Sequence, residues 1–285
     1  MTWIHSHTAR ARSFHLRIAG LLLALSATDS LSARDAGVDT SHYQGTNNWS
    51  SIKNNSPSRD FAWTKADEGT TNSFNDSTFT TNMNNGTAAG VLMGAYHFAH
   101  PESNAATAEA AHFLSVVEPN GPNGTPNYVG TGYLRPVVDI ETGNGAAVGS
   151  ANLSDWTNTF INYVINNGGG SRVEPLIYCN TNYAQSYFNS TIATRKLWIA
   201  NYNYSESQAL GTSNPPTGVW STWSFWQYSS SESVSGVGVN PVDTDAANGD
   251  INFVKTFQIQ AVPEPQIVSS LILLGLIRWR KRRPF

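Results

Sequence analysis

Residues 135–143, RPVVDIETG, carry an apolar run that ends in two acids, Asp139 and Glu141. In a β-strand, residues two positions apart point to the same side, so these carboxyl groups would face one way from backbone positions about 6.6–6.8 Å apart. Ile140 would then face the opposite way, into packing. Two carboxyl groups on one side suit acid–base catalysis, in which a positioned acid donates a proton. The alternative interpretation is a pair of solvated acids at a strand edge.

Two further acids lie far away along the chain. Asp39 stands near the end of an apolar run at residues 36–43, and Asp243 stands in NPVDTDAANGD, with Asp245 as the alternative to it. If the apolar runs form one barrel, four carboxyl groups meet at its mouth. Their mutual repulsion would raise some pKa values and leave a protonated acid near neutral pH. A glycosidase needs such a proton donor.

Aromatic residues occur within the same apolar runs, namely Tyr96, Tyr178, Trp198 and Trp226. Rings in such positions can stack on sugar faces, although core packing is the better explanation for each of them when it is taken alone. Together with the acids they favour a carbohydrate-binding cleft.

The elements that must position these residues are short β-rich runs separated by helical patterns. The predicted strands are residues 36–43, 61–67, 91–99, 135–141, 175–181, 197–202 and 224–230. Several are almost continuously apolar, as parallel strands covered on both faces are. Helices are predicted over 75–89, 103–117 and 154–170. The alternation predicts an α/β fold, either a parallel barrel or a doubly wound sheet. In a barrel the chemistry lies at the carboxyl ends of the strands.

Eight sequence blocks carry a family resemblance. They are GVDTSHYQG (37–45), KADEGT (65–70), GAYHFAHP (94–101), PVVDIE (136–141), LIYCN (176–180), LWIANYN (197–203), WQYSSS (226–231) and VDTDAANG (242–249). Together they resemble glycoside hydrolase family 25, the Chalaropsis-type lysozymes, over about residues 36–255 and in family order. The resemblance implies an irregular TIM-like β/α barrel, with helices sparse in its last third, that cleaves the β-1,4 bond after N-acetylmuramic acid in peptidoglycan without a cofactor.

The resemblance also implies roles for individual residues. Glu141 matches the general acid and Asp139 its partner, and Asp39 and Asp243 match the remaining acids of the groove. The positions expected near the bound sugar are Tyr96, Tyr178, Trp198 and Gln227. Two chemistries stay open: attack by the 2-acetamido group of the substrate with retention, or an aspartate acting as base for water with inversion.

The sequence departs from the family pattern in three places. Asp67 stands where Thr is common, Asp245 where Asn is frequent, and residues 246–247 are alanines in place of bulkier apolar residues. The last two departures leave open whether Asp243 or Asp245 is the fourth acid.

Both ends of the chain differ in composition from the middle. Residues 1–34 read as a signal peptide, with three arginines before the apolar run at 18–27 and cleavage expected between Ala27 and Arg34. Residues 259–285 hold a Pro-Glu-Pro motif at 263–265, an apolar run at 267–277 and a basic end. This tail resembles a PEP-CTERM sorting signal, with a permanent single-pass anchor or an ordinary amphipathic tail as the alternatives. A catalytic domain is expected over residues 35–258.

These end segments imply partners and a location. Signal peptidase and an exosortase-type processing enzyme would act on the two ends, and the tail would anchor the protein to the membrane transiently. The expected location is the cell envelope, cell surface or extracellular matrix of a Gram-negative-type bacterium.

Charge and cysteine content exclude other classes of function. The whole chain has a net charge of −3, but residues 35–262 carry eight Lys and Arg against eighteen Asp and Glu, a net charge of −10. An acidic body argues against nucleic acid as a partner. The single cysteine, Cys179, permits no internal disulfide and lies in an apolar run, which predicts a buried thiol. Three histidines, at positions 97, 100 and 112, lack the spacing of a metal site.

Two rival functions remain. One is a non-catalytic glycan-binding surface or matrix protein on the same fold, although a pure binder needs no proton donor. The other is a hydrolase of a different glycan such as chitin, although a D-x-x-D-x-D-x-E array is absent from residues 135–143.

Overall fold

The computed structural model describes residues 34–118, 127–141 and 145–262. The predicted signal peptide and sorting tail lie outside these residues, apart from Arg34 and residues 259–262. Within the described ranges, no helix has both the length and the apolar character that crossing a membrane requires.

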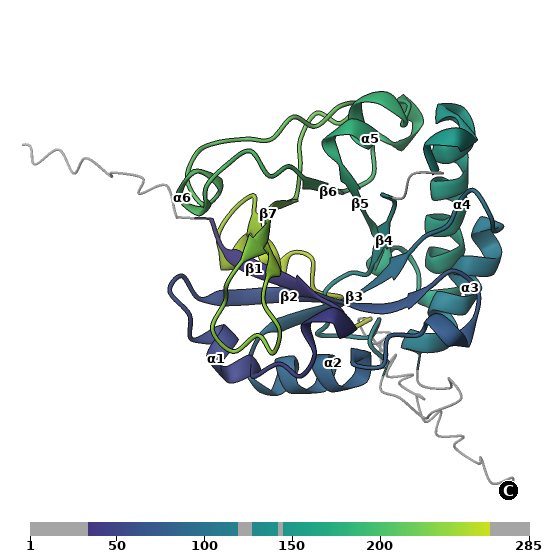
Figure 1. Cartoon of the computed structure of the whole chain (residues 1–285). Helices are drawn as coiled ribbons and strands as arrows, with labels where there is room; N and C mark the ends of the chain where they lie inside the picture. The colour runs from purple at the N-terminus through teal and green to yellow at the C-terminus, as the bar shows by residue number, and fades with distance from the viewer. Residues whose placement is uncertain (1–33, 119–126, 142–144, 263–285) are drawn as a thin grey trace, which may run out of the picture. The chain divides into compact units, whose positions relative to one another are not determined.

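Eight strands, joined in sequence order, close into a barrel (Figure 1). They are β1 (Ala36–Thr40), β2 (Arg59–Glu68), β3 (Leu92–Phe98), β4 (Val137–Asp139), β5 (Leu176–Asn180), β6 (Leu197–Ala200), β7 (Phe225–Glu232) and β8 (Val242–Ala247). The first seven strands run parallel, as predicted, whereas β8 is antiparallel to both β7 and β1. The connection from β7 to β8, residues 233–241, is too short for the crossover that a parallel partner requires. The barrel prediction is confirmed, and the all-parallel arrangement is wrong for β8.

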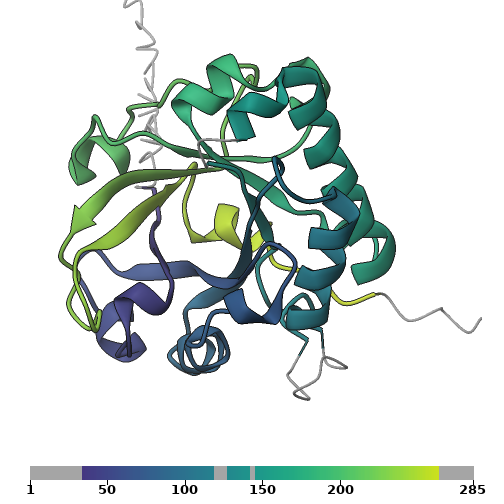
Figure 2. The ribbon, with the colours of Figure 1, turned by 45° about the vertical axis from the view of Figure 1, so that its right-hand side comes forward.

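The helices are concentrated in the first two thirds of the chain. They are α1 (Trp49–Lys53), α2 (Phe79–Ala88), α3 (Ala106–Val117), α4 (Ser150–Gly168), α5 (Thr181–Ser186), α6 (Glu206–Ala209) and α7 (Ile251–Lys255). Short 3-10 turns lie at η1 (His42–Gln44), η2 (Asn72–Phe74), η3 (Gly145–Val148), η4 (Ser171–Val173) and η5 (Ser190–Ile192). Figure 2 shows α3 and α4 side by side along one flank of the barrel. After β6 only α6 and α7 follow among the described residues, so the expected loss of helices in the last third is confirmed.

Helix starts differ from the prediction. Ser103 was expected to begin a helix, but α3 starts at Ala106 and its N-cap, Ala105, has no side chain that could accept a hydrogen bond. In α4 the first residue is Ser150, ahead of the predicted Ser154, which is buried inside the helix.

Aromatic side chains fill the barrel interior beneath the carboxyl ends of the strands. Phe61 and Trp63 from β2 pack with Phe225 from β7. Gly94 in β3 leaves room for this packing, because a Cβ atom there would collide with the Trp63 indole. At the amino end of the strands, Phe257, just beyond α7, packs against Phe225. This end of the interior is therefore filled by packed aromatic side chains, and the cavity described below lies at the other end.

The folded body extends slightly beyond residues 35–258 at both ends. The backbone N–H of Arg34 donates to Leu210, and its guanidinium lies 4.6 Å from the centre of the Trp223 ring. Ile259 is buried and exchanges backbone hydrogen bonds with the segment at residues 132–133. The folded body therefore includes at least residues 34–259.

Candidate active site

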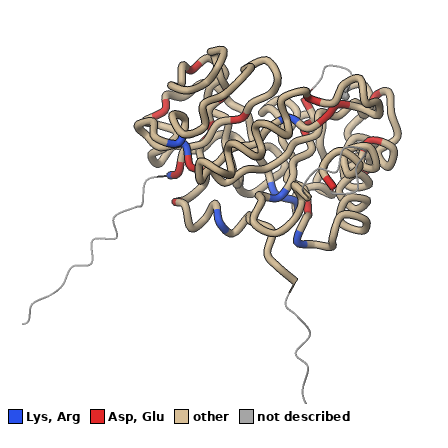
Figure 3. Tube along the Cα trace, turned by 90° about the horizontal axis from the view of Figure 1, so that it is seen from below, with Lys and Arg blue, Asp and Glu red and all other residues tan. Residues whose placement is uncertain are grey.

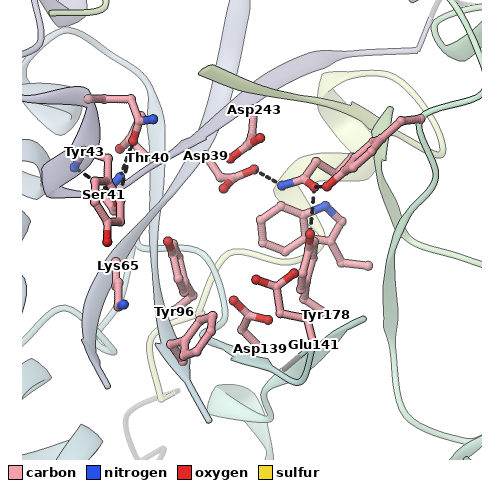
Figure 4. A pocket seen from close by; sticks show the side chains of 15 residues that line it. Asp39, Thr40, Ser41, Tyr43, Lys65, Tyr96, Asp139, Glu141, Tyr178 and Asp243 are labelled. Carbon is pink, nitrogen blue, oxygen red and sulfur yellow. Dashed lines mark hydrogen bonds between the residues drawn. The ribbon is translucent and has the colours of Figure 1, made fainter. Parts of the chain in front are cut away.

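All four predicted acids line one cavity of about 320 Å³ at the carboxyl end of the parallel strands (Figure 4). Asp39 is in β1, Asp139 ends β4, and Glu141 follows two residues later. Because β8 is antiparallel, its first residues lie at this same end, and Asp243 pairs directly with Asp39 in the β1–β8 register. The four acids, which are spread over 205 positions of sequence, are thus brought together by barrel closure.

The strand that carries the acid pair is shorter than predicted, since β4 ends at Asp139. Extended pairing nevertheless continues: the Asp139 carbonyl accepts from the Ala99 N–H at 3.0 Å, and the Ile140 N–H donates to Tyr178 at 2.9 Å. Ile140 is buried in the outer core, the hydrophobic cluster formed by strand residues and the helices packed on them. Asp139 and Glu141 therefore face the cavity together, as the alternation predicted.

The acid pair sits in an environment that favours its protonated forms. Burial raises the pKa of Glu141, while the neighbouring Tyr178 hydroxyl and the Lys65 ammonium partly offset this effect. Burial, and then the charge of Glu141, raise the pKa of Asp139 well above its usual range. The protonated form of each acid is therefore favoured more strongly than in a solvent-exposed carboxyl group.

The second pair of acids differs in depth. Burial and the charge of Glu141 raise the pKa of Asp243 to about 6. Burial and the charges of Asp243 and Asp245 raise the pKa of Asp39 well above its usual range. Asp243 lines the cavity, whereas Asp245 is fully buried and accepts from the Trp198 indole N–H at 2.9 Å. Of the two candidates for the fourth acid, Asp243 is the one at the cavity.

The four predicted sugar-binding residues also line the cavity. Tyr96 is partly exposed, but Tyr178, Trp198 and Gln227 are at most 5 % exposed. The Gln227 amide donates to Asp39 Oδ2 at 2.7 Å, and its carbonyl oxygen accepts from the Tyr178 hydroxyl at 2.7 Å. These buried residues therefore form a floor that holds Asp39.

Trp226 does not belong to the cavity. Its side chain lies in the outer core and its indole N–H donates to the Asn201 carbonyl at 2.9 Å. The alternation along β7 explains this position, because Gln227 and Trp226 must face opposite sides.

Lys65 supplies the one ammonium or guanidinium group among the described residues that line the cavity. Its Nζ donates to Glu68 at 2.6 Å and lies 4.6 Å from the centre of the Phe98 ring. In Figure 3 the basic positions are spread over the fold between the more numerous acidic ones. The positive charge of Lys65 therefore acts on the nearby acids of the cavity, in a protein that carries more acidic than basic residues.

Two exposed tyrosines at the cavity were not predicted. Tyr43 in η1 is 73 % exposed, and Tyr202, just after β6, is 51 % exposed and donates to Gln227 Oε1 at 2.5 Å. Both follow the carboxyl end of a strand within three residues. A search for aromatic residues at the carboxyl end of each predicted strand would have found both of them.

The histidines considered for metal binding have other partners. His97 lies between Asp67 and Glu109, with its ring nitrogens 3.0 and 2.8 Å from their carboxyl oxygens. No cluster suited to hold a metal ion occurs among the residues that the model describes. Cys179 is buried, and burial raises its pKa, so its thiol is not poised as a nucleophile.

Comparison with known proteins identifies relatives over most of the chain. A model of the family described as Glycosyl hydrolases family 25 matches residues 38–237. Lysozyme M1 of Streptomyces globisporus is 33% identical over 220 residues, which are 75% of this chain and 67% of that protein. The N,O-diacetylmuramidase of Arthroderma benhamiae is 27% identical over 248 residues, 84% of this chain and 94% of that protein.

The fold has a matching solved structure. The crystal structure of the bacterial lysozyme from Streptomyces coelicolor superimposes with a TM-score of 0.63 at 28% identity, covering 80% of this chain and 98% of that chain. The family match spans more than half of the chain and includes three of the four acids at the cavity. The chain is therefore a glycoside hydrolase that belongs to family 25.

Proposed function

We propose that the protein is a secreted muramidase that hydrolyses the β-1,4 bond between N-acetylmuramic acid and N-acetylglucosamine in peptidoglycan. Glu141 is the general acid and Asp139 assists it. The observation that carries this proposal is the pair of carboxyl groups on one side of an extended segment, both in the cavity and both with raised pKa values.

Position and burial support the division of labour between the two acids. Glu141 is partly exposed at the cavity, where it can reach a glycosidic oxygen, whereas Asp139 is buried more deeply. Asp139 Oδ1 is a buried acceptor without a hydrogen-bond donor among the described residues. An acceptor in this state is available to the N–H of a substrate 2-acetamido group.

The proposed reaction proceeds with retention. Glu141 transfers its proton to the glycosidic oxygen as the C1–O bond breaks, and the acetamido carbonyl oxygen, oriented by Asp139, bonds to C1 from the opposite face. Water then adds to C1 while the Glu141 carboxylate takes its proton. The cyclic intermediate opens, and both the acid and the acetamido group are regenerated.

The substrate proposal draws on the relatives. Two of them are named lysozyme and N,O-diacetylmuramidase, and the chain covers two thirds or more of each. Tyr96 and the exposed Tyr43 and Tyr202 offer rings at the cavity on which sugars can stack.

The two ends of the chain are proposed to act in export and sorting. The apolar run at 18–27 directs secretion, and the Pro-Glu-Pro tail anchors the protein transiently until an exosortase-type enzyme removes it. Mass spectrometry of protein recovered from the producing cell would give an amino terminus at or before Arg34 and a carboxyl terminus beyond Ile259. Recovery of the intact tail in the mature protein would favour a permanent anchor.

Product analysis tests the proposed reaction. The protein is incubated with purified peptidoglycan and, separately, with chitin, and the new reducing ends are identified by mass spectrometry. Muramic acid at the reducing end, released in the β-anomeric form by early NMR spectra, is the expected result. If the α-anomer forms first, the reaction proceeds with inversion and not by substrate assistance. New reducing ends from chitin alone would show that chitin is the substrate. Binding to peptidoglycan without release of products would favour a non-catalytic glycan binder.

A further inference from the structure

Asp245 is a fully buried acid that the proposed reaction does not use. One carboxyl oxygen, Oδ1, accepts from Trp198, but Oδ2 has no N–H or O–H donor among the described residues. A buried carboxylate oxygen without a donor is costly, so its partner must come from elsewhere. The nearby group is another carboxyl, that of Asp39: in the antiparallel β1–β8 pair Asp39 lies opposite Asp243 and Asp245 lies opposite Gly37, so Asp39 and Asp245 are diagonal neighbours on one face of the two strands and interact.

Two ionised carboxylates cannot hydrogen-bond, because both are acceptors only. Asp39 already accepts from Gln227 through Oδ2. The contact between Asp39 and Asp245 therefore becomes favourable only when one proton lies between them, as in other closely spaced carboxyl pairs.

The surroundings favour keeping that proton. Burial and the charge of Asp243 raise the pKa of Asp245 well above its usual range, and the opposing contributions of Trp198, Asp39 and Arg59 are smaller. Other titratable groups that act on Asp39, or on which Asp39 acts, come from the neighbouring strands and from the segment after β6: Tyr96, Asp139, Tyr178, Tyr202 and Asp243. Arg59 is the cation that acts on this pair, and its opposing effect on Asp245 is smaller than those of burial and of the Asp243 charge.

We propose that Asp39 and Asp245 share a single proton in the folded protein at neutral pH, and that Asp245 is thereby a positioning residue that fixes the Asp39 carboxyl in the active-site floor. The shared proton completes a polar chain through the barrel interior. It runs from the Trp198 indole through Asp245 and Asp39 to Gln227, whose carbonyl oxygen accepts from Tyr178. Only the effect on catalysis rests on the proposed function; the charge state is a property of the fold.

A shared proton fixes the net charge of the Asp39–Asp245 pair at −1. Replacing Asp245 by Asn keeps an acceptor for Trp198 and gives Asp39 an N–H donor, so Asp39 ionises fully. The pair in the natural protein and the Asn variant then both carry one negative charge. Substitution of an acid by a neutral residue should leave the net charge of the folded protein unchanged.

Native capillary electrophoresis at pH 7 tests this statement on the full chain. Asp155→Asn, at an exposed position in α4, is the matched control and should move by one unit charge. Asp245→Asn should show no change in mobility, and the double variant Asp39→Asn with Asp245→Asn should move by one unit charge. Near-UV circular dichroism establishes that each variant is folded.

A one-charge shift in Asp245→Asn equal to that of the control would overturn the proposal, because both acids would then be ionised in the natural protein. If Asp245→Asn does not fold, Asp39→Asn provides the same comparison, since the proton belongs to the pair. Peptidoglycan hydrolysis does not enter this readout, so failure of the muramidase proposal and failure of the shared proton are separately visible.

Discussion

At the scale of single residues, the proposed mechanism requires that Glu141 keeps a proton until it donates it to the substrate. Burial of Glu141 and Asp139 opposes ionisation, and their closeness adds mutual repulsion. Lys65 acts in the other direction on both acids. In the proposed mechanism, the balance between burial on one side and the Tyr178 hydroxyl and the Lys65 ammonium on the other sets the pH range in which Glu141 can act as an acid.

Replacing Lys65 by Met keeps much of its apolar stem and removes its charge. The pKa of Glu141 should rise, so the acid stays protonated to higher pH and the alkaline limb of the plot of kcat against pH shifts to higher pH. The measurement is kcat on soluble peptidoglycan fragments across pH, with Lys53→Met as the control far from the cavity. An alkaline limb that stays in place or moves down would mean that Lys65 does not influence the proton donor.

At the scale of elements, a buried ion network joins α3 to the strands that carry Lys65 and Tyr96. His97 in β3 contacts Asp67 in β2 and Glu109 in α3, and all three side chains are fully buried. Burial alone would lower the pKa of His97, but the two acids, led by Asp67, raise it to about 9. The charged imidazolium is therefore the native form.

Substitution of His97 by Gln should destabilise the protein by about 3–5 kcal/mol, because two buried carboxylates lose the charged imidazolium that lies between them. The unfolded chain releases this proton near pH 6.5 and the folded protein near pH 9. The stabilisation is thus complete below pH 6.5 and disappears as pH rises through 9. Urea unfolding at pH 6 and at pH 9.5 measures it, and an equal loss at both values would contradict a charged His97.

Elements were predicted from sequence where the local pattern is strong. All seven predicted strands are present in the structure. They could be predicted because short, continuous apolar runs bounded by turn residues are typical of buried strands. The antiparallel strand β8 was missed, since VDTDAA carries two acids and only closure against β1 explains why Asp245 is buried and Asp243 partly buried. The start of α3 was misjudged because Ser103 offers a capping side chain that the fold does not use.

At the scale of the whole molecule, barrel closure converts distant sequence positions into one site. The four acids could be predicted from their type and their place at strand ends, and the family resemblance supplied their roles and the four residues expected near the sugar. Tyr43 and Tyr202 were missed, and Trp226 was wrongly grouped with the cavity aromatics. Asp39 and Asp243 are direct register partners, a fact that no sequence spacing contains. The position of Asp245 below Asp39 in the barrel could not be predicted from the sequence either, because depth within a barrel depends on the stagger of the strands.

The end segments are expected to be dispensable for catalysis. A fragment of residues 34–262 contains the barrel, the Arg34 contacts and the buried Ile259. It should unfold at the same temperature as the full chain and retain its kcat, which calorimetry and the peptidoglycan assay measure. A fragment that is unfolded or inactive would show that the ends contribute to the catalytic body.

The most direct test of the account is the rate of peptidoglycan hydrolysis by Glu141→Gln, compared with the natural protein and with Glu232→Gln at the end of β7. The account predicts a fall in kcat of about 10²–10⁴-fold for Glu141→Gln, as expected for loss of a general acid, with an unchanged melting temperature. The control should keep its full rate. Hydrolysis by Glu141→Gln at the rate of the natural protein would contradict the assignment of the proton donor and with it the proposed mechanism.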